Sequence, residues 1–118
     1  MEFVQTQRFI PGQTIFQAGE PGTKMYIVRE GEVELLFRGK VIGIIGKGGI
    51  LGEMAVIDNS SRSATACALT DCELVVVDQE RFLTLVHQKP SFAIEVMKVL
   101  VERLRLMNER ALGSSQGA

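Results

Sequence analysis

Glycine is concentrated in one part of this 118-residue chain, and its placement limits what the chain can fold into. Ten of the twelve glycines fall between Gly12 and Gly52, where they separate short runs of β-branched and aromatic residues. Because glycine readily adopts the backbone angles of tight turns, this spacing predicts many short strands. No helix-length apolar pattern interrupts the region, which argues against a parallel sheet built from alternating strands and helices. We therefore expect a mainly β fold with C-terminal helices. Its strands should form an antiparallel β-roll, a jelly-roll-like double-stranded barrel.

Alternating apolar and charged residues support the same fold in the middle of the chain. In the segment 32–38, Val33, Leu35 and Phe37 are predicted to face one side of a strand while charged residues face the other. The segments 63–68 and 74–77 are rich in apolar residues and are predicted to add further strands.

After Val77 the apolar spacing changes from that of strands to that of helices. Asp78 is a candidate N-cap for a helix that ends before Pro90. Pro90 suits the first turn of a second, longer helix that runs to about Leu112. We assign residues 1–112 to one domain and residues 113–118, which offer nothing to pack, to a flexible tail.

The long helix carries two neighbouring apolar stripes. The first is regular and is expected to pack against the roll rather than to form a dimer seam; it contains Ala93, Met97, Leu100, Leu104, Met107 and Ala111. The second is interrupted by Arg103 and contains Phe92, Val96, Val99 and Leu106. This helix remains a candidate surface for a second copy of the chain or for an effector protein.

Composition and charge exclude several classes of function. Hydrophobic residues make up 46% of the chain and charged residues 23%, as in a folded domain rather than a disordered segment. The formal net charge of −1 argues against direct binding to nucleic acid, which requires a surplus of positive charge. The single histidine, His87, leaves little basis for a metal site or a histidine-dependent catalytic triad. We expect no enzyme activity, no cofactor and no metal.

The cysteines and the apolar runs indicate a cytoplasmic protein. Cys67 and Cys72 are too few for a disulfide framework and lie among apolar residues, as small buried side chains do in a reducing compartment. The apolar runs are too short for a signal peptide or a membrane span, so we expect no membrane insertion.

The segment 52–65 contains groups suited to binding a phosphate next to a sugar. A short helix-compatible run begins at Glu53, and the first amides of a helix carry partial positive charge and favour an anion. Arg62, at the far end of the same loop, can place a planar fork of donors on two phosphate oxygens, and Ser63 adds a hydroxyl. A phosphate would repel the carboxylate of Glu53. The presence of this carboxylate is explained if it accepts hydrogen bonds from hydroxyls next to the phosphate, such as those of a ribose.

With these residues in view, the chain resembles the cyclic nucleotide-binding domain family. This family includes the bacterial catabolite activator, kinase regulatory subunits and cyclic nucleotide-gated channels. The resemblance covers roughly Arg8 to Arg110 and rests on four motifs: P-G-Q-T-I-F-Q-A-G-E-P-G from Pro11, M-Y-I-V-R-E-G-E-V from Met25, G-K-G-G-I-L-G-E-M-A from Gly46, and R-S-A-T from Arg62. The run G-E-M-A, followed six residues later by R-S-A-T, is the family's phosphate-binding cassette.

The resemblance implies roles for individual residues in binding a cyclic nucleotide. Glu53 would bond the ribose 2′-hydroxyl and Arg62 would pair with the cyclic phosphate. Ser63 and the amides around Met54 and Ala55 would complete the cradle. Gly52, which follows Leu51 in the site, would permit close approach of the backbone, and Arg103 would cap the purine.

The function implied by the resemblance is that of a regulatory module whose C-terminal helix moves when a 3′,5′-cyclic nucleotide binds. Serine at position 63 matches the bacterial activator and favours cAMP over cGMP as the ligand. Two alternatives stay open at this point. The roll could have lost its ligand and serve as a protein-interaction module, or the chain could be a fragment of a larger transcription factor, channel or kinase.

Overall fold

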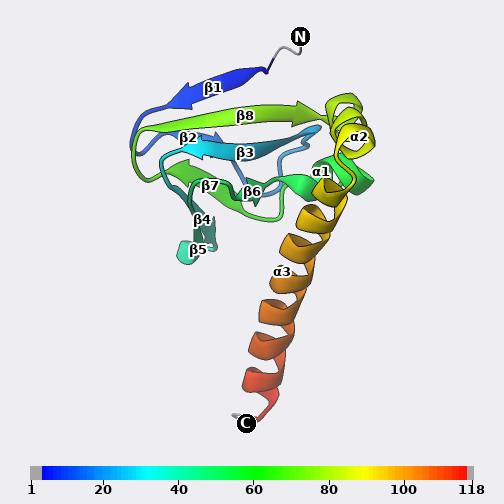
Figure 1. Cartoon of the computed structure of the whole chain (residues 1–118). Helices are drawn as coiled ribbons and strands as arrows, with labels where there is room; N and C mark the ends of the chain where they lie inside the picture. The colour runs from blue at the N-terminus through cyan, green and yellow to red at the C-terminus, as the bar shows by residue number, and fades with distance from the viewer. Residues whose placement is uncertain (1–3, 117–118) are drawn as a thin grey trace. The chain divides into compact units, whose positions relative to one another are not determined.

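The computed structural model describes residues 4–116, and over this range the chain forms two four-stranded antiparallel sheets and three helices (Figure 1). The first sheet has the strand order β1 (Thr6–Phe9), β8 (Cys72–Asp78), β3 (Lys24–Glu30) and β6 (Ile50–Leu51). The second has the order β2 (Thr14–Phe16), β7 (Thr65–Ala68), β4 (Val33–Phe37) and β5 (Lys40–Ile45). The predicted antiparallel β-roll is therefore confirmed.

Apolar side chains from both sheets form one core. Its members are Phe9, Phe16, Tyr26, Val28, Val33, Leu51, Ala66, Ala68, Cys72, Leu74 and Val76. The predicted alternation along β4 holds only in part, because Val33 is fully buried whereas Phe37 is 43% exposed. The pairing of β4 with β5 shifts register between Leu35 and Leu36, and this irregularity breaks the two-residue period.

Gly31, in the turn between β3 and β4, occupies a position that only glycine suits. Its φ of 89° lies in the left-handed region. A Cβ built on Gly31 would also clash with the backbone oxygen of Asp71 and lie 2.9 Å from the Sγ of Cys72. The turn therefore packs directly against the start of β8.

The chain divides into two units between Leu83 and Thr84, within α2 (Gln79–Gln88). Asp78 caps this helix as predicted, because its Oδ1 accepts a hydrogen bond of 2.7 Å from the amide of Arg81. Helix α3 (Ser91–Gln116) makes up most of the second unit. Neither helix combines the length with the apolar character that crossing a membrane requires, within the residues described.

One expectation for α3 is corrected. The helix continues through Gln116 instead of ending near Leu112, because backbone hydrogen bonding carries on into the Gly-Ser segment; residues 117–118 of the predicted tail lie outside the described residues. In the first stripe Met97 and Leu104 are 55% and 58% exposed, and the packing of this stripe against the roll stays a prediction. Phe92 and Val96 of the second stripe are buried.

Candidate functional site

A short helix begins immediately after the edge strand β6. Leu51 ends this strand and is fully buried, and Gly52 then adopts a left-handed conformation with a φ of 76°. This turn of the backbone starts α1 (Glu53–Asp58) and directs its first residue inward, so that Glu53 is only 1% exposed. The structure therefore holds a carboxylate in the protein interior at the start of a helix.

The loop that follows α1 returns Arg62 to the same place. Arg62 is 8% exposed, and its Nη1 donates a hydrogen bond of 3.2 Å to the carbonyl oxygen of Gly52. The amide of Ala55 donates to that same oxygen at 3.3 Å. The Gly52 carbonyl thus connects both ends of the segment that the sequence singled out.

A second loop, residues 17–23 between β2 and β3, is tied to the backbone of Arg62. The amide of Arg62 donates to the carbonyl of Glu20 at 2.8 Å, and the amide of Gly19 donates to the carbonyl of Arg62 at 2.7 Å. The amide of Ala18 donates to the hydroxyl of Thr65 at 3.0 Å. These bonds hold the loop and the arginine together as one piece of structure.

Two aromatic rings lie beside the guanidinium of Arg62. Its Cζ is 4.2 Å from the ring centroid of Phe16 and 6.0 Å from that of Tyr26. The two rings stack on each other, with centroids 6.1 Å apart and an interplanar angle of 27°. A cation near the face of a ring is attracted by the negative potential of that face.

Two glycines allow the backbone to approach the guanidinium closely. A Cβ at Gly22 would clash with Cζ and Nε of Arg62 and would lie 2.8 Å from Nη2. A Cβ at Gly52 would lie 2.6 Å from Nη1. At Gly52 the backbone therefore lies close to the arginine, and its predicted approach to a ligand stays a prediction.

Burial and neighbouring charge act on Arg62 in opposite directions. Desolvation lowers the pKa of Arg62 below its usual value, while Tyr26, Glu20 and Glu53 favour its charged form. Arginine stays protonated at physiological pH despite such a shift. The site therefore holds a buried positive charge next to a buried carboxylate.

The structure brings together most of the predicted site residues. Leu51, Gly52, Glu53, Met54, Ala55 and Arg62 lie on β6, α1 and the following loop. The side chain of Ser63 is exposed. Arg103 is half-buried on α3, in the second unit, so its predicted role in capping a purine stays a prediction.

Sequence reasoning missed two residues at the site, Phe16 and Gly22. Both fall within the motif that begins at Pro11, but no role was assigned to them. Their contact with Arg62 exists because the loop between β2 and β3 meets the loop after α1. No local sequence pattern predicts that these two loops meet. The glycine next to a proline at positions 21–22 was the available signal for a close backbone approach.

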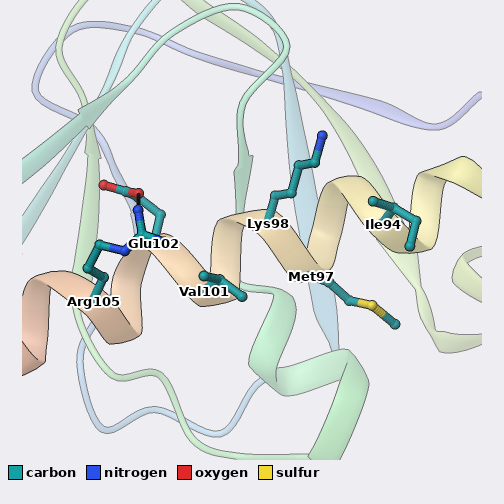
Figure 2. A pocket seen from close by; sticks show the side chains of 6 residues that line it. All are labelled: Ile94, Met97, Lys98, Val101, Glu102 and Arg105. Atoms are coloured by element: carbon teal, nitrogen blue, oxygen red, sulfur yellow. Dashed lines mark ion pairs between the residues drawn. The ribbon is translucent and has the colours of Figure 1, made fainter.

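Neither a metal cluster nor a deep cavity competes with this site among the residues that the structure describes. Among the residues that the structure describes, His, Cys, Asp and Glu form no cluster that could hold a metal ion. A shallow hollow runs along α3 in the second unit, lined by Ile94, Met97, Lys98, Val101, Glu102 and Arg105 (Figure 2). Glu102 and Arg105 form an exposed ion pair of 3.7 Å there, which contributes little to stability.

Comparison with known proteins supports the resemblance noted in the sequence. A family model described as the cyclic nucleotide-binding domain matches residues 6–89. The chain is 32% identical over 111 residues to the cyclic AMP receptor protein of Thermus thermophilus, which covers 89% of this chain and 51% of that protein. It is 39% identical over 71 residues to the cGMP-dependent protein kinase egl-4 of Caenorhabditis elegans, which covers 60% of this chain and 9% of the kinase.

The solved structures show the same fold. The crystal structure of the catabolite activator protein of Thermus thermophilus matches with a TM-score of 0.83 at 31% identity. The match covers 95% of this chain and 55% of that chain. The chain therefore spans about half the length of these Thermus thermophilus proteins.

Proposed function

The chain belongs to the cyclic nucleotide-binding domain family, and from this membership we propose that it binds cAMP in preference to cGMP at the site formed by α1 and Arg62. The observation that carries the proposal is the buried guanidinium of Arg62, which lies against Gly52 at the start of α1 and beside the buried Glu53. A buried cation held at the start of a short helix beside a carboxylate suits a ligand that joins an anion to hydroxyl groups.

The cyclic phosphate is assigned to Arg62. A guanidinium offers five N–H donors, and its hydrogen bond to Gly52 uses one of them. The remaining donors can form the paired hydrogen bonds that arginine makes with phosphate. The amides around Met54 and Ala55 would complete the cradle, with Ala55 sharing or releasing its 3.3 Å bond to Gly52.

The ribose is assigned to Glu53. An ionised carboxylate only accepts hydrogen bonds, and the 2′-hydroxyl of a ribose is a donor. A carboxylate as buried as Glu53 makes such bonds in a medium of low dielectric constant, where they are strong. The carboxylate thereby contributes selectivity for a ribonucleotide over its 2′-deoxy analogue.

The preference for cAMP follows from Ser63 and from the bacterial relative. The resemblance to the bacterial activator implies that serine at this position goes with cAMP, and the Thermus thermophilus relative is named as a cyclic AMP receptor protein. The kinase relative is named as cGMP-dependent, so the alternative nucleotide is cGMP. Both nucleotides therefore belong in one titration.

The proposed role is regulatory, with binding coupled to movement of α3. Arg103 on this helix would cap the purine, so that the helix closes over the bound nucleotide. The ligand can act as a switch only if it binds the closed state more tightly than the open one. The effector that reads the closed state, whether a second copy of the chain or another domain, would contact α3.

Calorimetric titration of the protein with cAMP and with cGMP tests the proposal. We expect saturable binding of both and a lower Kd for cAMP, whereas flat titrations at high concentration would favour a ligand-free interaction module. Arg62→Ala should cost about 2–4 kcal/mol of binding free energy, because it removes charged hydrogen bonds to the phosphate. Arg38→Ala is the matched control, since Arg38 also lies over a ring, that of Phe37 at 5.1 Å, but on the β4–β5 hairpin. An equal loss of affinity in both variants would contradict the assignment of Arg62.

A further inference from the structure

We infer that Phe16 is a positioning residue for Arg62. The ring of Phe16 sets the plane of the Arg62 guanidinium, so that the N–H donors not bonded to Gly52 can pair with the phosphate. The inference rests on the proposed function and adds to it a residue outside the phosphate-binding segment. Phe16 ends β2, is 9% exposed, and has its ring centroid 4.2 Å from the Cζ of Arg62.

A single hydrogen bond does not orient a guanidinium. The bond from Nη1 to the Gly52 carbonyl fixes one atom of the group at 3.2 Å but leaves its plane able to rotate about that bond. A second contact is needed to select one orientation. The ring of Phe16, itself held by stacking on Tyr26, provides a rigid surface at the distance of a cation–π contact.

A contact with a ring face has a further advantage over another hydrogen bond. Stacking engages the flat face of a guanidinium and consumes none of its N–H donors, which point outward in the plane. A carboxylate partner in the same place would occupy two of those donors and compete with the phosphate. Phe16 therefore holds Arg62 in place while leaving its donors for the ligand.

The surrounding glycines leave little freedom for any other arrangement. Gly22 and Gly52 contact the guanidinium so closely that a Cβ at either position would clash with it or lie within 2.6–2.8 Å of its nitrogens. The ring, the two glycines and the Gly52 carbonyl therefore lie around the guanidinium of Arg62, a residue that is 8% exposed. Because the guanidinium already has the orientation that pairs with the phosphate, less side-chain entropy is lost when the ligand binds.

Substitution of Phe16 tests this role against that of an ordinary core residue. Phe16→Leu removes the ring but keeps an apolar side chain, and it should weaken cAMP binding roughly tenfold. Phe16→Tyr keeps the ring and should restore the wild-type Kd. Phe37→Leu, which removes the ring under the exposed Arg38, is the matched control and should leave the Kd unchanged.

A double-mutant cycle shows whether Phe16 acts through Arg62. In an Arg62→Lys background the cation has no plane to orient, so Phe16→Leu should change the Kd by about twofold or less. A tenfold loss in both backgrounds would overturn the inference, because the ring would then act independently of the guanidinium. If the wild-type protein binds neither cyclic nucleotide, the proposed function fails instead.

A measurement on the wild-type protein covers the case in which Phe16→Leu does not fold. The Nε–Hε signal of Arg62 in an NMR spectrum should be shifted upfield by the Phe16 ring, and its order parameter should match that of the rigid backbone. An unshifted signal with an order parameter below about 0.6 would show a freely moving side chain and refute the positioning role.

Discussion

Gly22→Ala tests directly how tightly the protein encloses Arg62. The backbone angle of Gly22 lies outside the left-handed region, so alanine should fit the backbone without strain. Its Cβ, however, would clash with Cζ and Nε of Arg62 and approach Nη2 to 2.8 Å. The three atoms nearest to this Cβ all belong to Arg62, so the substitution acts first on the guanidinium.

The magnitude follows from what the guanidinium loses when it moves away. It gives up a hydrogen bond from a charged donor to Gly52, worth about 1.5–3 kcal/mol, and a ring contact worth about 0.5–2 kcal/mol. Water regained by the displaced group offsets part of this loss. Alanine also restricts the unfolded chain, which stabilises the protein by about 0.4–1 kcal/mol. We expect a net loss of about 1–3 kcal/mol in the free energy of unfolding.

The same substitution should have the opposite sign when Arg62 is absent. In an Arg62→Ala background the Cβ meets no guanidinium, so only the effect on the unfolded chain remains, a gain of about 0.4–1 kcal/mol. Urea unfolding of the four proteins in the cycle gives both values. Gly46→Ala is the control, because a Cβ there has no neighbour within 4 Å and its φ is not left-handed. An equal loss from Gly22→Ala in both backgrounds would refute the enclosure of Arg62.

Three further outcomes are expected. Glu53→Gln should reduce the preference for cAMP over 2′-deoxy-cAMP by about 1–2 kcal/mol, since a neutral acceptor binds the hydroxyl more weakly; an unchanged preference in a competition titration would remove Glu53 from the ribose site. Arg103→Ala should weaken cAMP binding by about 0.5–2 kcal/mol if its guanidinium stacks on the purine, whereas the neighbouring Arg105→Ala should leave calorimetric affinity unchanged. Gly31→Ala should lower the free energy of unfolding by about 2–4 kcal/mol, because a left-handed φ and the backbone of Asp71 both oppose a Cβ; a thermal midpoint equal to that of the wild type would contradict the turn geometry.

The strands could be predicted because their signals are local. Arg38 and Gly39, at the turn between β4 and β5, have positive φ angles of 52° and 78°, and a glycine at this point in the sequence is a direct signal for such a turn. The packed face of α3 could not be chosen in the same way. Two adjacent stripes have similar apolar content, and which one is buried depends on the surface that each meets rather than on helical spacing.

In the candidate site, too, some residues could be predicted from the local sequence and others could not. Glu53 and Arg62 lie close together in the chain, and their residue types alone predicted a phosphate-and-sugar site. Phe16 and Gly22 belong to a distant loop, and their role exists only because the hydrogen bonds between Gly19, Glu20 and Arg62 join that loop to the site. Contacts of this kind carry no short-range pattern, so the fold is needed to find them.

The place of β8 in its sheet has a consequence for how the chain is made in the cell. This strand is the last in chain order, yet it lies between β1 and β3 and pairs with both (Figure 1). Until the ribosome has synthesised Asp78, β1 and β3 therefore have open edges of the kind that attract other nascent chains. Pairings between such distant segments also form slowly, on the order of milliseconds to seconds. Pairing should consequently cover these two edges only after β8 has emerged from the ribosome.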